Sequence, residues 1–146
     1  MAFRDSSDLE DLPVFYNVLL AVGNNAPNLK EDVLLVQFLL LETYSGKLKF
    51  APFNTRPQGN MTLDGICGPI TKNWILKFQL DIRFIGGNPL LDKRIDRARE
   101  VISSISRTVY TIISLNQIVK QVRPDFDNLD KAVDVPRELI PVFTQF

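Results

Sequence analysis

Histidine is absent from this 146-residue chain, and cysteine occurs once, as Cys67. Without histidine the chain lacks the usual imidazole general base and the commonest zinc ligand. One cysteine allows neither an intramolecular disulfide nor a cysteine-rich metal cluster. Zinc peptidases, Ser-His-Asp hydrolases and Cys-His proteases are therefore excluded, and we expect no metal or other cofactor. Composition alone does not exclude an enzyme that uses a pair of carboxylates. No motif in the sequence identifies such a pair, however, so we expect no enzyme.

A dominant charge and a long apolar run are missing too. Lys and Arg number 17, Asp and Glu also 17. This balance argues against a nucleic-acid partner, because such binding depends on neutralising phosphates. The apolar run "VLLVQFLLL" is too short to span a membrane, and the acidic start "MAFRDSSDLEDLP" lacks the features of a secretory signal. We expect a chain that is cytoplasmic when synthesised and has no membrane span.

Helical spacing is found in the first two segments. In Leu9–Val22 the apolar residues fall on one stripe, which predicts a helix packed on the domain or an arm that docks on another subunit. Asn28 and Glu31 have the spacing of a capping box and predict a helix over Leu29–Thr43. That helix is apolar on nearly every side, so either flanking segments or a partner must cover it. Residues 45–61 form a long connection with a possible short strand over 47–53.

The stretch "DGICGPITKNWILKFQ", Asp64–Gln79, combines a turn with a helix start. Asp64-Gly65 is a turn signal, and Pro69 is suited to the first helical position. Apolar residues then recur about every fourth position, which predicts an amphipathic helix. A further helix is predicted over Arg107–Val122. The alternating charges of 92–100 indicate a solvated face, and the prolines beyond Arg123 predict an extended tail that lies on its own domain or on a neighbour.

These pieces, taken together, resemble the small three-helix peptidoglycan-binding domain. The resemblance covers about residues 28–119. It rests on five pieces: "EDVLLVQFLLLETY", "LDGICGPIT", "NWILKFQ", "DKRID" and "TIISLN". Lys93 stands where the family has a glycine in the second turn, so the geometry of that turn is not carried over. No strong internal repeat is evident, although "DGICG" and "DKRID" share a faint shape.

The resemblance implies an all-α fold: a three-helix bundle with, in this chain, an N-terminal helix and an extended C-terminal tail. We predict an N-terminal helical arm over 1–27, the peptidoglycan-binding-like domain over 28–122 and the tail over 123–146. It also implies a non-catalytic role, holding a protein or particle against the bacterial cell wall. Peptidoglycan is the expected ligand. Other protein subunits are expected to bind the two arms.

Most motif residues are expected to be structural. Gly65 and Gly68 fix the turn, Thr71 caps or supports the helix and Phe78 fills the core. Asp64 either caps neighbouring backbone or faces the ligand, and Trp74 either lies in the core or stacks on a sugar. We predict a shallow ligand groove beside residues 62–66, with three hydrogen-bonding residues: Thr62, Asp64 and Asn73.

A competing hypothesis is a structural component of a phage-like or contractile injection particle that reuses this fold without binding the wall. The two arms and the very apolar second helix favour it. Both hypotheses suit a protein that acts at the cell wall in a released or exported particle. They differ in whether purified cell wall retains the chain.

Overall fold

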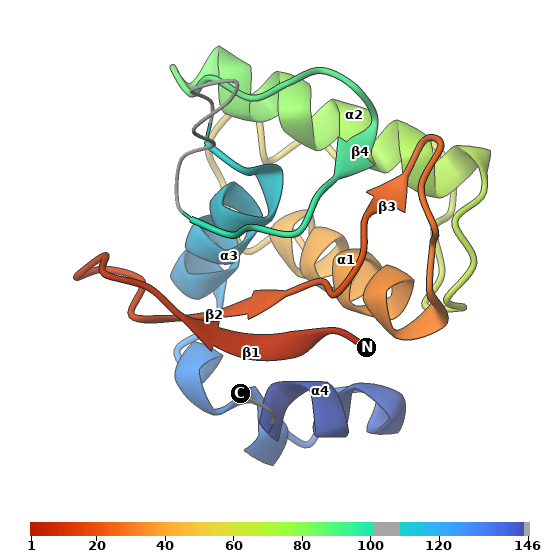
Figure 1. Ribbon diagram of the computed structural model, residues 1–146. Helices are drawn as coiled ribbons and strands as arrows, with labels where there is room; N and C mark the ends of the chain where they lie inside the picture. Colours follow the sequence, from red (N-terminus) through yellow and green to blue (C-terminus); the bar gives the residue numbers. More distant parts are fainter. Residues whose placement is uncertain (101–108, 145–146) are drawn as a thin grey trace.

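The computed structural model describes residues 1–100 and 109–144, and Figure 1 shows how they are arranged. The fold is mixed α/β. The prediction of an all-α fold is therefore wrong, because two small antiparallel sheets accompany the helices. The elements in chain order are β1 (Phe3–Ser6), β2 (Val14–Asn17), β3 (Val22–Gly23), α1 (Lys30–Thr43), α2 (Pro69–Phe84), β4 (Arg94–Ile95), α3 (Thr111–Val122), the 3-10 helices η1 (Phe126–Lys131) and η2 (Arg137–Leu139), and α4 (Ile140–Thr144).

The predicted N-terminal helix over Leu9–Val22 is wrong, since this segment contributes strands. β1 and β2 pair antiparallel, with Phe3 opposite Asn17, and β3 pairs with β4. Pro13 lies in the middle of the segment, where it would interrupt a helix. The residues that follow it, "VFYNV", are mostly β-branched or aromatic and favour a strand. Because β2 is buried on both sides, its consecutive apolar residues imitate part of a helical stripe.

Helix α1 confirms the second predicted helix and lies at the centre of the fold (Figure 1). Its residues 32–40 are all buried. The cover comes from the chain itself, since α2, α3, β3 and η2 contact this helix. The predicted capping box does not form. Asn28 instead adopts a left-handed backbone (φ 53°), and its side chain bonds the backbone N–H and C=O of Gly23.

Helices α2 and α3 agree with prediction, although residues 107 and 108, the predicted start of α3, lie outside the described residues. Trp74 and Phe78 are fully buried on the inner face of α2. Residues 47–53 form turns and loop, so the possible strand there is wrong. Gly68 has an ordinary φ of −93°, and within the described part of the chain a Cβ there would touch nothing. Its expected role in fixing the turn is therefore not needed.

The predicted extended tail is also wrong, because residues beyond Arg123 form η1, η2 and α4 (Figure 1). The tail lies on its own domain, one of the two expected places. Pro136 precedes η2, and Pro141 occupies the first turn of α4, where a missing N–H is tolerated. Tyr16 on β2 anchors the tail: its hydroxyl donates to the Phe126 carbonyl at 2.6 Å, and its ring packs edge-on against Phe143.

Arg123 joins the tail to α1 through an ion cluster in which the guanidinium is buried and the two aspartate partners are exposed. Its guanidinium is 5% exposed and donates two 2.8 Å bonds to the two carboxylate oxygens of Asp134. It also bonds Asp125 and, at 3.1 Å, Glu42 of α1. These hydrogen bonds lower the pKa of both aspartates. Together with a core that extends from Ala2 to Phe143, the cluster makes both predicted arms part of one folded unit.

Candidate functional site

The Asp64 turn forms as the sequence predicts. Asp64 Oδ1 accepts a 2.9 Å hydrogen bond from the N–H of Ile66, and Gly65 between them has a φ of +72°. Asp64 Oδ2 accepts a 3.3 Å hydrogen bond from the Thr62 hydroxyl. Asp64 therefore caps neighbouring backbone, which was the first of its two expected roles.

A buried amide from α1 holds this turn in place. Gln37 Nε2 lies 3.0 Å from Asp64 Oδ1 and 3.1 Å from the carbonyl oxygen of Ile66. It also lies 3.2 Å from the Thr71 hydroxyl, while Gln37 Oε1 accepts a 3.0 Å bond from the Gly65 N–H. Gln37 was not predicted from the sequence as a residue that holds the turn. The signal was present as a single amide inside an apolar helix, since a buried polar group needs partners.

The second turn repeats this arrangement around Gln79 of α2. Gln79 Nε2 lies 3.0 Å from Asp92 Oδ1 and 3.0 Å from the carbonyl oxygen of Arg94. It lies 3.3 Å from the hydroxyl of Thr111, and Gln79 Oε1 accepts a 3.1 Å bond from the Lys93 N–H. Asp92 in turn accepts the Arg94 N–H at 3.0 Å. The faint likeness of "DGICG" and "DKRID" is therefore a repeat in structure.

Lys93 occupies the glycine position of this second turn without changing its geometry. Its φ of +57° is close to the +72° of Gly65. A residue with a Cβ costs about 1–2 kcal/mol in this left-handed region. The hydrogen bonds that Gln79 accepts from the Lys93 N–H and Asp92 accepts from the Arg94 N–H offset that cost.

Lys93→Gly should consequently raise the free energy of unfolding by about 1 kcal/mol, because glycine adopts this backbone without strain. Urea denaturation of the purified chain measures the change. Lys93→Ala is the matched control: it removes the same side chain but keeps the Cβ, so stability should stay within about 0.5 kcal/mol of the original. A gain of equal size in both variants would show that the lysine side chain, and not the backbone, carries the strain.

A third amide ties the N-terminal sheet to α3. Asn116 Oδ1 accepts the Tyr16 N–H at 2.7 Å, and Asn116 Nδ2 donates to the Tyr16 carbonyl at 2.9 Å. Each of the three long helices thus projects one buried amide onto a neighbouring backbone segment. These contacts fix the positions of the three helices, the two turns and the N-terminal sheet. Together these elements form the frame on which the exposed residues lie.

The predicted ligand-binding residues lie on the outside of this frame. Thr62 and Asp64 are exposed and hydrogen-bonded to each other. Asn73 is exposed on α2, and among the described residues no hydrogen bond joins it to the other two. Bonds from Ile66 and Gln37 lower the pKa of Asp64, so its carboxylate is charged at neutral pH. Binding by these three residues stays a prediction.

Trp74 is not available for stacking on a sugar. Its side chain is fully buried, and its indole N–H donates to the carbonyl oxygens of Gln58 and Gly59, both at 3.2 Å. Its core placement is confirmed. Cys67 is half-buried, and burial raises the pKa of its thiol, as suits a small apolar residue better than a reactive thiolate.

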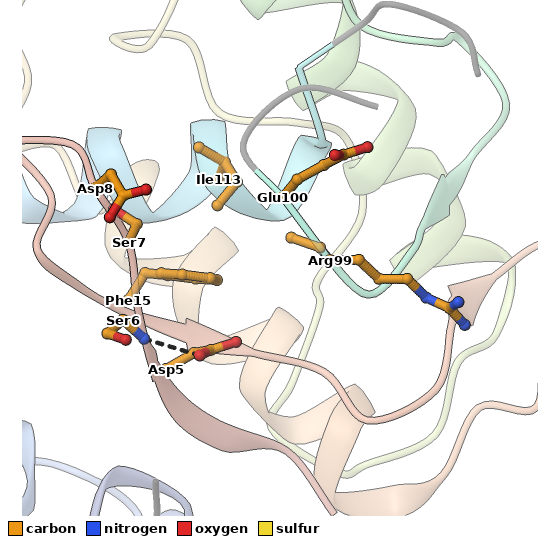
Figure 2. Close-up of a pocket in the computed structure, with 9 residues that line it drawn as sticks. Asp5, Ser6, Ser7, Asp8, Phe15, Arg99, Glu100 and Ile113 are labelled. Atoms are coloured by element: carbon orange, nitrogen blue, oxygen red, sulfur yellow. Dashed lines mark hydrogen bonds between the residues drawn. The ribbon is translucent and has the colours of Figure 1, made fainter. Parts of the chain in front are cut away.

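A cleft of about 340 Å³ lies on another side of the frame, between β1, α3 and the segment after β4 (Figure 2). Volumes near this value are typical of small-ligand sites. Its lining combines carboxylates, hydroxyls and apolar side chains: Asp5, Ser6, Ser7, Asp8, Phe15, Ala98, Arg99, Glu100 and Ile113. The guanidinium of Arg99 points away from Asp5 and Asp8 (Figure 2). Sequence reasoning missed the cleft because it placed part of the hairpin in a helix.

Across 1–100 and 109–144, no three His, Cys, Asp or Glu residues are grouped so that they could hold a metal ion. In the same part of the chain, no helix combines the length and the apolar character needed to cross a membrane.

Comparison with known proteins gives no relative. No family model, no curated protein and no solved structure matches this chain.

Proposed function

We propose that the chain is a non-catalytic module that binds peptidoglycan as part of a larger assembly. One observation carries the proposal: Asp64, Gly65, Thr71 and Gln79, which are among the residues on which the sequence resemblance rests, belong to a hydrogen-bonded arrangement that occurs twice. Asp64, Gly65 and Thr71 meet Gln37, and their counterparts in the second turn meet Gln79. The spacing of the motif therefore has a structural cause.

The rim of the first turn offers the chemistry that such a ligand needs. Peptidoglycan presents sugar hydroxyls, N-acetyl groups and peptide amides. The charged carboxylate of Asp64 accepts hydrogen bonds, and Thr62 and Asn73 both donate and accept them. Leu63 and Ile66 are exposed beside them and supply apolar surface for the C–H faces of a sugar ring. Because Gln37 holds the turn, little conformational freedom is lost on binding.

The proposed setting is a particle that is made in the cytoplasm and acts at the cell wall after release or export. Any hydrolysis of the wall then belongs to a partner. The N- and C-terminal segments do not dock as free arms in this proposal, because the described residues of both segments pack into the core of the chain.

Purified sacculi should retain the full-length chain in a co-sedimentation assay. At subsaturating concentrations, the double variant Thr62→Ala/Asn73→Ala should reduce the bound fraction about thirtyfold, because two lost hydrogen bonds at about 1 kcal/mol each weaken binding by about 2 kcal/mol. Both side chains are exposed, so the fold should be unaffected. The matched control is Asp8→Ala at the cleft, which should bind like the original chain. Retention no greater than in buffer alone sinks the proposal, and a loss confined to Asp8→Ala contradicts the assignment to the rim.

A further inference from the structure

The cleft between β1, α3 and the segment after β4 reaches the hydrophobic core of the chain (Figure 2). Three of its lining residues, Phe15, Ala98 and Ile113, belong to that core. With a volume of about 340 Å³, the cleft has room for a small organic molecule. Its apolar wall favours a molecule that has an apolar group of its own.

The polar part of the cleft is dominated by carboxylates. Asp5 and Asp8 line it from the N-terminal hairpin, and Glu100 lines it from the segment after β4 (Figure 2). Residues 5–11 of the hairpin contain four acidic residues and no Lys or Arg. Of these, Glu10 and Asp11 are exposed beyond the cleft. Their charge adds to the negative potential that a cation meets on its way to the cleft.

The nearest cations are directed away from these carboxylates. Among the described residues that line the cleft, Arg99 is the one cation. Figure 2 shows its guanidinium pointing away from Asp5 and Asp8. Arg97 is not part of the lining, and its guanidinium lies over the ring of Phe3, 5.0 Å from the ring centre.

Arg4 precedes Asp5 in the chain but lies on the other face of the hairpin. Arg4 is opposite Tyr16 in the β1–β2 pairing, and Asp5 is opposite Phe15. Successive side chains of a strand point to opposite faces. Because Phe15 and Asp5 both line the cleft, Arg4 is on the face away from it.

Both hairpin carboxylates keep room for a ligand. Asp5 accepts the Ser6 N–H at 2.8 Å and the Asn17 side-chain amide at 3.3 Å, one on each oxygen. Asp8 has no hydrogen bond or ion pair in the described part of the chain. A carboxylate can accept about four hydrogen bonds, so each has acceptor positions left.

This combination selects the class of ligand. An anion would be repelled by the carboxylates, and a neutral molecule would leave their charge uncompensated. A metal ion needs convergent ligands, and no three His, Cys, Asp or Glu side chains in 1–100 and 109–144 are grouped to hold one. A protonated amine donates charge-assisted hydrogen bonds without needing that convergence.

We propose that the cleft binds a small organic cation: a protonated primary amine that carries an aromatic or branched alkyl group. Its ammonium group donates to the carboxylates of Asp5 and Asp8, and its apolar group packs on Phe15 and Ile113. This inference does not depend on wall binding, because the cleft and the rim of the first turn have no residue in common.

2-Phenylethylamine is the probe, and its titration into the ¹⁵N-labelled full-length chain gives its Kd from the backbone amide shifts. Three matched compounds are the controls: 2-phenylethanol lacks the charge, 3-phenylpropanoate has the opposite charge, and methylammonium lacks the apolar group. The probe should bind with a Kd of about 1 mM or tighter, and at least about tenfold more tightly than each control. Its shifts should fall on residues 5–8 and 98–100, and added salt should weaken it.

The double variant Asp5→Asn/Asp8→Asn should raise the Kd of the probe about tenfold or more, because both charges are lost and the side-chain size is kept. Asparagine can still accept the Ser6 N–H, so the hairpin should stay folded, which circular dichroism checks. Asp11→Asn is the matched control. It removes an exposed carboxylate of the same hairpin that is not part of the lining, so the Kd should change less than about twofold.

Several outcomes would overturn the proposal. Equal binding of 2-phenylethanol removes the charge argument, and equal binding of methylammonium removes the apolar contact. The absence of saturable shifts at about 10 mM probe, or shifts that fall outside the cleft, would show that the cleft does not bind the amine. An equal loss in Asp11→Asn would assign binding to the general charge of the hairpin. The titration involves neither sacculi nor the rim residues, so failure of this proposal is distinguishable from failure of wall binding.

Discussion

Replacing Gln37 by leucine should lower the free energy of unfolding by about 3 kcal/mol. Leucine fills nearly the same space in the centre of α1 but makes no hydrogen bond. The Gly65 N–H, the Ile66 carbonyl and the Thr71 hydroxyl each lose their glutamine partner. A buried polar group without a partner costs about 1–3 kcal/mol. Part of this is recovered because the outer turn residues can bond water, and so the total stays below the sum of three such costs.

Urea denaturation followed by circular dichroism measures this loss. Gln121→Leu is the matched control, because Gln121 is an exposed glutamine on α3. Its replacement should change stability by no more than about 0.5 kcal/mol. A loss below about 1 kcal/mol for Gln37→Leu would show that the buried amide is not what holds the first turn.

Gly23→Ala should be at least as damaging, with a loss of about 3–5 kcal/mol. A Cβ at Gly23 would lie 2.1 Å from the carbonyl oxygen of Lys93 and 2.9 Å from the Cα of Arg94. Both are backbone atoms of the second turn and β4, so neither can rotate away as a side chain does. The φ of +117° adds strain for any residue with a Cβ. The β3–β4 pairing must therefore shift or separate, and overpacking of this kind costs about 1–3 kcal/mol or more.

The variant Gly46→Ala separates the cost of backbone strain from the cost of steric overlap. Gly46 also has a positive φ, of +92°, but a Cβ there would meet no atom within 4 Å in the described structure. We expect a loss of about 1 kcal/mol, from backbone strain alone. Thermal unfolding of the two variants beside the original chain gives the comparison. Equal losses at the two positions would mean that the close approach of Gly23 to the second turn has no energetic consequence.

The parts of the fold that follow from local sequence were predictable. The periodic apolar residues of α1 and α2 and the turn chemistry of Asp64-Gly65 gave correct elements within about one residue at their starts. Strand β2 was missed because a buried strand has no polar alternation to reveal it, and Pro13 was the signal that a helix was wrong. The tail was missed because its prolines begin helical turns as readily as they end them.

The structural reason for the motif was not predictable from local pattern. Gln37 meets Asp64 across 27 positions, and Gln79 meets Thr111 across 32. No short-range rule joins residues at such separations. Lys93 also concealed the repeat, because a lysine at positive φ is uncommon and only the surrounding hydrogen bonds keep it there. A lone amide in an apolar helix, such as Gln37, needs a hydrogen-bond partner elsewhere in the chain.

The most direct test of the account is an NMR titration of the ¹⁵N-labelled full-length chain with soluble peptidoglycan fragments. We predict saturable shifts of the backbone amides of Thr62–Ile66 and of the Asn73 side-chain amide, with Gln37 and the core unchanged. This result would place the ligand on the rim of the first turn. The account is contradicted if no amide resonance shifts at millimolar concentrations of fragment. It is also contradicted if the shifts fall on residues 5–8 at the cleft and leave the rim unchanged.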